Sequence, residues 1–388
     1  MIQPPGTLSV VPRQRPAGAG KVVHRSARCD LRVSPAKRER CFALLAAGGD
    51  VWACVLELNA IRRQRGAWPI ASYQALCREL SLAGPGCFGE LSSVAARSVL
   101  RRYSDAFFSA AKARRAGDAS VHYPRRRRHL MSLGFYAGTF SLEGRRLTLP
   151  VARGAPPLVV SLKRAVPYEM SQVRSVTLGQ CAGRLFLEVT AEVPVQANDA
   201  DPARVAGVDL GIIHPYAVAT TSEALLVSGR ALRAESRLHL ADSKARSQAT
   251  ARRAPKKGQR GSRRWRKVRA SQRLAEASHR RRISQAQHEA AAEVISWAVA
   301  RRIGTLVVGH PAEIARRDAG RRQNLAVHNW RMAHLLSTLS DKAEVAGIAL
   351  LTVDERGTSS TCPECRSRTS KPKGAHLLLH LVRAPRPS

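Results

Sequence analysis

Apolar residues recur at helical spacing over roughly the first third of the chain. The clearest stripe lies in residues 91–115, where Tyr103 and Phe107 stand one helical turn apart, and it predicts an amphipathic helix. Residues 41–58 and 73–82 predict two further helices. Aromatic residues at this spacing usually face a core, so we expect a packed helical part here.

The periodicity changes to two between Phe135 and Val195. Apolar and polar residues alternate there in short runs, which Gly and Pro separate. Alternation of this kind is typical of strands with one buried face. The sequence therefore predicts a small antiparallel sheet or barrel in this part of the chain.

The stretch from Val205 to Thr220, VAGVDLGIIHPYAVAT, places Asp209 inside a run of strand-forming residues. Burying a carboxylate costs free energy unless it is paired or bound to a cation. One interpretation is an aspartate that opens an ordinary hairpin turn. The other is a metal-binding carboxylate on the first strand of a nuclease sheet.

Two more apolar strands are predicted at Thr305–Pro311 and Ile348–Val353. Amphipathic helices at Glu289–Arg302 and Trp330–Ala346 precede them. Strands joined by crossover helices lie parallel in one sheet. The C-terminal half therefore predicts an α/β domain, which follows the helical and small β parts.

Composition points to a polyanionic partner. The 388 residues carry a net charge of +37, from 65 Lys and Arg against 28 Asp and Glu, and 54 of the basic residues are Arg. Arginine binds phosphate through two parallel hydrogen bonds and stacks on bases. We expect no membrane partner, because no run of about 18 apolar residues is evident that would span a bilayer.

The cysteines and the N-terminus indicate the compartment. Six of the eight cysteines are isolated in the sequence, which is typical of a reducing environment. The first residues are rich in Pro and Gly and lack the apolar core of a signal peptide, so we expect a disordered leader over residues 1–28. The expected localisation is the bacterial cytoplasm, in association with the nucleoid.

Residues 230–282 form the most basic segment, with 19 Lys or Arg against three acids. Pro255–Gly258 divides it into two predicted helices, an arginine-rich hairpin. Like charges at these spacings repel one another unless a polyanion neutralises them. We expect nucleic acid to contact the basic residues around the turn, which are Lys256, Lys257, Arg263, Arg264, Arg266, Lys267 and Arg269.

A second basic run directly follows Tyr123 and Pro124. Runs of charge are commonly solvated loops, but beside an aromatic residue and in a chain of this net charge the run is a candidate phosphate contact. Its members are Arg125, Arg126, Arg127 and Arg128.

Several motifs together resemble the TnpB-type proteins. They are GVDLGI (207–212), the basic segment behind it, LVVGHP (306–311) and DKAEVAGIALLTVDERGTSSTCPEC (341–365). TnpB-type proteins are insertion-sequence-encoded, RNA-guided nucleases with a RuvC/RNase H-like fold, similar to type V CRISPR effectors. The match runs from about Asp30 to Lys373. It implies a guide RNA and a DNA target as partners, and Mg²⁺ held by carboxylates.

The resemblance also implies the metal-binding acids. Asp209 matches the first. Many relatives carry the second as a Glu at the end of the strand that corresponds to 306–308, where this sequence has Gly-His-Pro and then Glu313. Another branch carries it in the DERGTS segment, which Glu355 matches. We prefer Glu355, because its strand and that of Asp209 are expected to end at one edge of the sheet, and keep Glu313 as the alternate.

Cys362 and Cys365 resemble the first half of a zinc ribbon, whose second C-x-x-C would follow some 15–20 residues later. After Gly374 the sequence has neither Cys nor Asp, so the second cysteine pair and the third acid of the resemblance are absent. We interpret this as a truncation or frameshift. His376 and His380 could complete a Zn²⁺ site, but at shorter than usual spacing, so the expected zinc site is incomplete.

The predicted fold class is α/β with additional helical and small β parts. Its domains are a disordered leader (1–28), a helical nucleic-acid recognition region (29–134), a small antiparallel β-barrel-like region (135–200), a RuvC/RNase H-like nuclease domain (201–361) that contains the basic hairpin (230–282), and a partial zinc ribbon with an aberrant tail (362–388). Two functions remain open. One is an RNA-guided, Mg²⁺-dependent DNA endonuclease associated with an insertion sequence. The other is a cleavage-deficient RNA- or DNA-binding remnant or repressor.

Overall fold

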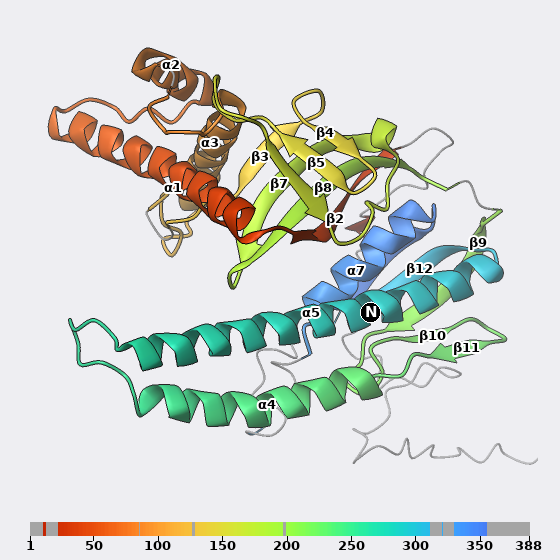
Figure 1. Ribbon diagram of the computed structural model, residues 1–388. Helices are drawn as coiled ribbons and strands as arrows, with labels where there is room; N and C mark the ends of the chain where they lie inside the picture. The colour runs from red at the N-terminus through yellow and green to blue at the C-terminus, as the bar shows by residue number, and fades with distance from the viewer. Residues whose placement is uncertain are drawn as a thin grey trace, which may run out of the picture. The chain divides into compact units, whose positions relative to one another are not determined.

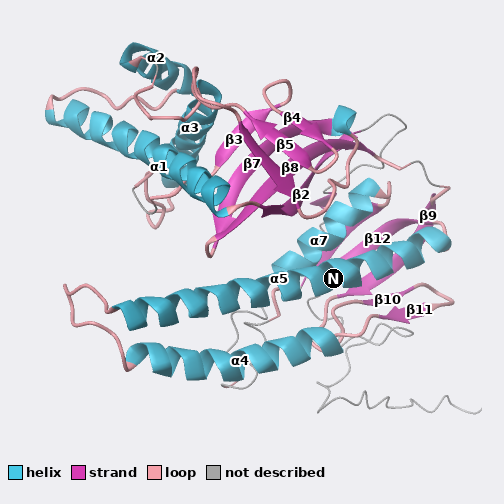
Figure 2. Cartoon of the chain, in the orientation of Figure 1, coloured by secondary structure: helices cyan, strands magenta, loops and turns pink. Residues whose placement is uncertain are grey.

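The structure, a computed structural model, describes residues 11–12, 22–84, 86–125, 129–196, 199–310, 320 and 330–354 (Figure 1). The chain divides into two compact units. Unit 1 consists of Met1–Lys21, Val195–Arg253 and Ser278–Ser388, and unit 2 consists of Val22–Pro194 and Ala254–Ala277. Both contain helices and strands (Figure 2).

An antiparallel sheet of seven strands, in the order β3-β7-β8-β2-β6-β5-β4, forms the centre of unit 2. Its strands are β2 (Val22–Arg32), β3 (Leu133–Tyr136), β4 (Ser141–Glu143), β5 (Arg146–Leu149), β6 (Leu158–Leu162), β7 (Val173–Cys181) and β8 (Arg184–Pro194). A short 3₁₀ helix, η1 (Met170–Gln172), precedes β7. Alternate residues of β8, such as Leu187, Val189 and Ala191, are fully buried. The strands predicted from the period-two pattern are therefore present.

Strands β1 and β2 correct the expected disordered leader over residues 1–28. Strand β2 begins at Val22, so the predicted leader over 1–28 is too long, and residues 11–12 also form a short strand, β1 (Val11–Pro12). Strand β2 lies between β8 and β6 although the helices separate it from them in sequence. Charged residues that face solvent alternate along β2 with buried ones, among them Val23, Cys29 and Leu31. Because of these charges, β2 contains no apolar run by which the sequence would indicate a strand.

Three helices pack with this sheet, as the sequence predicted. They are α1 (Pro35–Gln64), α2 (Tyr73–Ala83) and α3 (Ser93–Arg115). Each follows a serine, Ser34, Ser72 or Ser92, whose side-chain oxygen accepts a hydrogen bond from a backbone N–H in the first turn. Tyr103 of α3 is 3% exposed in the core, as its helical spacing predicted.

Helix α1 differs from the expectation about membrane spans. Within the part of the chain that the structure describes, it has the length and apolar composition of a helix that could cross a bilayer. The core helix of a soluble protein can share these properties. Cys41, Leu44 and Leu45 of α1 are buried against the sheet and α3 of unit 2.

Unit 1 is built on a sheet of six strands in the order β1-β13-β12-β9-β10-β11. Besides β1, its strands are β9 (Asp201–Asp209), β10 (Ala217–Ala219), β11 (Ala224–Leu226), β12 (Ile303–His310) and β13 (Ala349–Asp354). β12 runs parallel to both β9 and β13, whereas β10 and β11 continue from β9 as an antiparallel hairpin. The parallel arrangement predicted from the crossover helices is confirmed.

The described helices α4 (Arg230–Ala251) and α7 (Met332–Val345) belong to unit 1. Helix α5 (Arg263–Ala300) belongs to unit 1 from Ser278 onward and to unit 2 up to Ala277. One face of the sheet carries Val208 and Val308, which pack with Val294 of α5 and Leu339 of α7 in a single core. The predicted basic hairpin is present as the antiparallel pair α4 and α5 (Figure 1). The separate helix expected at Glu289–Arg302 is instead the C-terminal part of α5, because no Gly or Pro interrupts this helix.

Candidate active site

Asp209 is the last residue of β9. Ala206 and Val208 on this strand are buried in the core, whereas Gly207 and Asp209 point to the other side of the sheet and are exposed. The strand periodicity therefore keeps the carboxylate out of the core. The carboxylate of Asp209 forms no hydrogen bond or ion pair with any of the residues that the structure describes, although the chain has more than twice as many basic as acidic residues.

The parallel register brings the carboxyl ends of three strands together. Val208 pairs with Val308, and Val308 pairs with Thr352. The following residues on the three strands, Asp209, Gly309 and Val353, therefore lie at one level. Neighbouring strands are about 4.8 Å apart, so Asp209 and Val353 are separated by roughly 10 Å. Paired residues share a face of the sheet, so position 353 faces the same side as Asp209, and Asp354 faces the opposite side.

The other predicted metal ligands lie outside the described residues. This holds for both candidate second acids, Glu355 and Glu313, and for the zinc candidates Cys362, Cys365, His376 and His380. Among the residues whose structure is described, no three His, Cys, Asp or Glu side chains form a group that could hold a metal ion. These site assignments stay predictions.

A tight turn follows Asp209 directly. A Cβ atom added to Gly211 would lie 2.6 Å from the carbonyl oxygen of His214, closer than any ordinary contact, so this turn requires glycine. The turn is followed by Tyr216, whose side chain is fully buried in the core. Burial raises the pKa of the Tyr216 phenol, which keeps its hydroxyl protonated. The Tyr216 side chain therefore anchors the end of this turn in the core.

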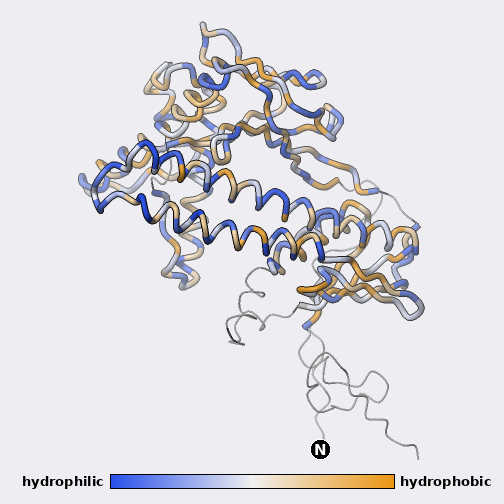
Figure 3. Tube along the Cα trace, turned by 60° about the horizontal axis from the view of Figure 1, so that its bottom comes forward, coloured by the Kyte–Doolittle hydropathy of each residue, from blue (hydrophilic) through white to orange (hydrophobic). Residues whose placement is uncertain are grey.

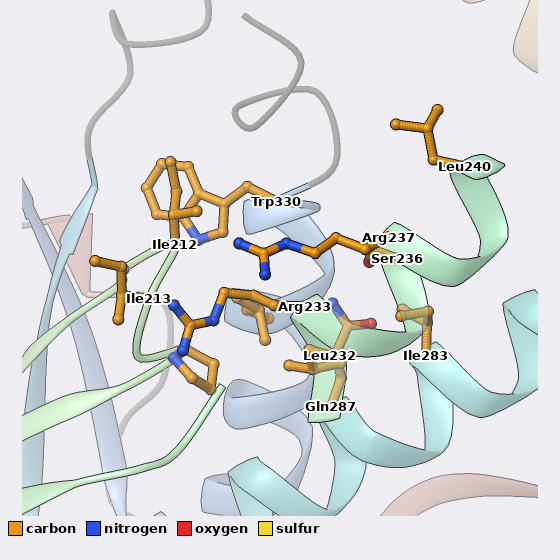
Figure 4. A pocket seen from close by; sticks show the side chains of 13 residues that line it. Ile212, Ile213, Leu232, Arg233, Ser236, Arg237, Leu240, Ile283, Gln287 and Trp330 are labelled. Carbon is orange, nitrogen blue, oxygen red and sulfur yellow. The ribbon is translucent and has the colours of Figure 1, made fainter. Parts of the chain in front are cut away.

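A cavity of about 710 Å³ lies next to this turn (Figure 4). Gly211, Ile212 and Ile213 form one wall, and residues of α4, α5 and α7 form the others. Three buried polar atoms of its lining have no hydrogen-bond partner among the described residues. They are Nε of Arg233, Oε1 of Gln287 and Nε1 of Trp330. An unsatisfied buried polar atom costs about 1–3 kcal/mol, so three of them around one cavity require an explanation.

The hairpin helices are joined near their base by a small, partly buried network. The carboxylate of Glu235 on α4 accepts hydrogen bonds from Arg282 at 2.7 Å and from His279 at 2.9 Å, both on α5. The hydrogen bond from Arg282 is the main cause that lowers the pKa of Glu235 to about 2, and the bond from His279 adds to it against the opposing effect of burial. The imidazole of His239 stacks on that of His279 with 3.7 Å between ring centroids. The network fixes the register of α4 against α5.

The predicted nucleic-acid contacts of the hairpin are all exposed. We call them the hairpin-tip surface, which consists of Lys256, Lys257, Arg263, Arg264, Arg266, Lys267 and Arg269. None forms an ion pair with an acid among the described residues, and hydrophilic positions recur along both helices towards the turn (Figure 3). Arg269 also lies over the ring of Trp265, 5.1 Å from its centroid. The surface is available to a polyanion.

The second basic run is described only in part. Arg125 is exposed, and Tyr123 before it is 45% exposed and packs against Phe107. Arg126, Arg127 and Arg128 lie outside the described residues. The phosphate contact predicted for this run stays a prediction.

Sequence analysis missed the polar residues of the cavity. Gln287 lies between the predicted hairpin (230–282) and the predicted helix at Glu289–Arg302, and only the packing in the structure shows that its side chain is 2% exposed. Trp330 was predicted simply as the start of a helix. Arg233 and Arg237 stand one turn apart on α4, which is the one signal in the sequence that could have pointed to this face.

Two families match parts of the chain. Residues 188–315 match the OrfB_IS605 family, described as a probable transposase, and residues 333–383 match the Cas12f1-like TNB domain. No curated protein matches the sequence at a significant level.

A solved structure with a TM-score above 0.5 shares the fold. A Cas12f1–sgRNA–target DNA complex is similar with a TM-score of 0.64 at 11% sequence identity, over 90% of this chain and 92% of that chain. A CRISPR-Cas12f ternary complex aligns over 85% of this chain and 73% of that chain at 14% identity, with a TM-score of 0.35. The predicted fold class is confirmed, and so is the resemblance to TnpB-type proteins and type V effectors.

Proposed function

We propose that this chain, a protein of the TnpB and Cas12f type, is an RNA-guided, Mg²⁺-dependent DNA endonuclease. The observation that carries the proposal is the position of Asp209. It is an exposed carboxylate at the carboxyl edge of a parallel sheet, without a partner among the described residues, in a chain with a net charge of +37. Such edges are where α/β sheets bind their ligands.

The donor chemistry at this edge fits Mg²⁺. The ion prefers oxygen ligands and is commonly held by one or two carboxylates together with substrate phosphates. Asp209 would supply the first carboxylate. Bound Mg²⁺ would activate a water for attack on a phosphodiester and stabilise the leaving oxygen. Two features position Asp209: the buried side chain of Val208, the residue before it, and the tight turn at Gly211, two residues after it.

The register of β13 favours Glu355 as the second carboxylate. Val353 is level with Asp209 and on the same face of the sheet. Glu355 follows it two residues later, which is one period of a strand. Asp354, by contrast, is directed to the opposite face. Glu313 remains the alternate.

Guide RNA and target DNA are the proposed partners. The structurally similar Cas12f1 complex contains an sgRNA and a target DNA. In this chain the hairpin-tip surface and Arg125 supply exposed positive charge that would contact phosphates without regard to sequence. Sequence would be selected by pairing between guide and target.

The test is cleavage by the purified chain with RNA transcribed from its own locus and DNA matched to that guide. We expect cutting in Mg²⁺ and none in EDTA. Asp209→Asn should lower the rate at least about 10³-fold, because the amide has the same shape but no charge to hold the ion. Glu355→Gln should act similarly, whereas Asp354→Asn should leave cleavage within about threefold.

The rival function is binding without cleavage, since residues 375–388 contain no Asp that would match the third acid of the resemblance. It predicts that the RNA–protein complex binds matched DNA with equal affinity in Mg²⁺ and EDTA and leaves it intact. Cutting that survives Asp209→Asn would contradict the proposed site.

A further inference from the structure

The cavity beside Asp209 combines an apolar wall with polar atoms that lack partners. Ile213 and Leu240 at its rim are 58% and 47% exposed, and Leu232 and Ile283 line it further in. The polar atoms without partners are the N–H groups of Arg233 and Trp330, which are hydrogen-bond donors, and Oε1 of Gln287, which is a hydrogen-bond acceptor. Figure 4 shows the side chains of Arg233 and Gln287 among the apolar ones, with the Trp330 ring near the opening.

These features define the chemistry of an occupant. An occupant with a flat, apolar face fits, because Ile and Leu side chains and an indole ring form part of the walls. Its edge needs both hydrogen-bond acceptors and a donor, because two donors and one acceptor are left unpaired. The volume of about 710 Å³ lies within the range of about 300–1,000 Å³ for pockets that bind small ligands.

One side of the cavity also favours negative charge. Arg237 lines it with an exposed guanidinium group. Helix α4 begins at Arg230, within one turn of the lining residue Leu232. The hydroxyl of Ser228 accepts a hydrogen bond from the Arg230 N–H at 3.5 Å, and the N-cap residue, Gly229, has no side chain. The positive end of a helix of 22 residues stabilises a nearby phosphate.

We propose that this cavity receives one base of a single-stranded stretch of the substrate DNA. The base would be held flat between the apolar wall and the Trp330 ring, and its edge would satisfy Arg233 and Gln287. Its phosphate would lie towards Arg237 and the start of α4. Because Gly211 in the cavity wall is two residues after Asp209, an inserted base anchors the strand beside the proposed cleavage site. The inference rests on the proposed nuclease function and adds to it how the strand is positioned.

Binding of mononucleotides to the full-length protein tests the proposal without cleavage. The probes are the four 2′-deoxynucleoside 5′-monophosphates, with 2-deoxyribose 5-phosphate as the ligand that lacks a base. Affinities are measured by calorimetry in EDTA. We expect at least one nucleotide to bind about tenfold or more tightly than the sugar phosphate, since stacking and edge contacts of one base are worth that much or more.

Gln287→Leu and Gln285→Leu form a matched pair of variants. Both remove an amide from α5, but Gln287 is buried in the cavity lining and Gln285 is exposed two residues away. Gln287→Leu should reduce the preference for the nucleotide over the sugar phosphate at least about threefold, and Gln285→Leu should leave it unchanged. Gln287→Leu should not lower the melting temperature, because it removes an unpaired polar atom. Arg233→Met gives an independent second variant with the same expected loss.

Three results would overturn the proposal: equal affinity for nucleotide and sugar phosphate, no binding of any nucleotide, or equal loss in the Gln285 and Gln287 variants. Failure of the proposed nuclease function is distinguishable from these. A protein that binds nucleotides through Gln287 but does not cut DNA has the base pocket without the activity. A protein that cuts DNA in an Asp209-dependent manner without this preference has the activity without the pocket.

Discussion

The phenolic hydroxyl of Tyr216 donates a hydrogen bond to the backbone carbonyl of Leu335 across 2.8 Å in the core of unit 1. The bond connects the segment behind Asp209 to helix α7, 119 residues later in the sequence. Leu335 also lines the cavity next to the turn. One buried contact thus joins the segment after Asp209 to helix α7 beside the cavity.

Tyr216→Phe should destabilise unit 1 by about 1 kcal/mol, because the ring still fills its site and only the hydrogen bond is lost. We expect a decrease of roughly 2–4 °C in the melting temperature, measured by calorimetry. Tyr136→Phe is the control, since Tyr136 is 48% exposed and no hydrogen bond of its hydroxyl is observed within the described residues. An equal effect of both substitutions would show that the bond contributes nothing.

Gly211→Ala should impair cleavage more than stability. The added methyl would meet the His214 carbonyl, so the turn has to move, and Asp209 two residues before it moves as well. A displacement of about 1 Å in a catalytic group can cost about 10²-fold in rate. Gly207→Ala, on the strand that ends in Asp209, is the matched control. A methyl group there would contact only the Ala219 carbonyl oxygen, at an ordinary distance of 3.9 Å. Cleavage rates and melting temperatures of both variants test this directly.

Glu235→Gln should loosen the hairpin in a pH-dependent manner. The pKa of Glu235 is lowered from 4.5 to about 2, chiefly by the hydrogen bond from Arg282. A lowered pKa gives stability that is present above about pH 4.5 and is lost as the pH falls towards 2. At pH 7 we expect the variant to be less stable by about 1–2 kcal/mol, and this difference should shrink between pH 4.5 and 2.

Thermal unfolding across this pH range measures that difference. Asp242→Asn is the control, because Asp242 pairs with Arg246 on the same helix and both side chains are substantially exposed. Such a pair contributes little. A Glu235→Gln difference that does not depend on pH would contradict the role of the carboxylate.

Removal of charge from the hairpin-tip surface should weaken nucleic-acid binding and its dependence on salt. For Arg264→Ala with Lys267→Ala, both exposed and three residues apart on α5, we expect the slope of log affinity against log salt to fall by about 1.5–2. Alanine preserves the helix. Arg174→Ala in unit 2 is the control, since Arg174 is already paired with Glu192 at 2.8 Å. An unchanged slope would exclude this surface from phosphate contact.

Much of the architecture follows from local pattern. The parallel order of β9, β12 and β13 was predictable because long crossovers permit no other pairing of neighbours. β2 was not predictable, because its charges mask the alternation and its partners lie far along the chain. The break expected before Glu289 was wrong because a change in charge does not end a helix that lacks Gly and Pro.

One part of the candidate site was likewise predictable from the sequence and another part was not. Asp209 was recognisable because a motif encodes it within one strand. The cavity was not, because the burial of Gln287 depends on helices that only tertiary packing brings together. Glu355 is a prediction from sequence that rests on the register of the strand before it.

The continuous helix α5 includes residues of both compact units. Its 38 residues correspond to about 57 Å of uninterrupted helix. Val294 near one end is embedded in the core beneath the sheet, and Arg266 near the other belongs to the hairpin-tip surface. The backbone therefore passes from unit 2, which contains Arg266, into unit 1, which contains Val294, within one helix that has no Gly or Pro.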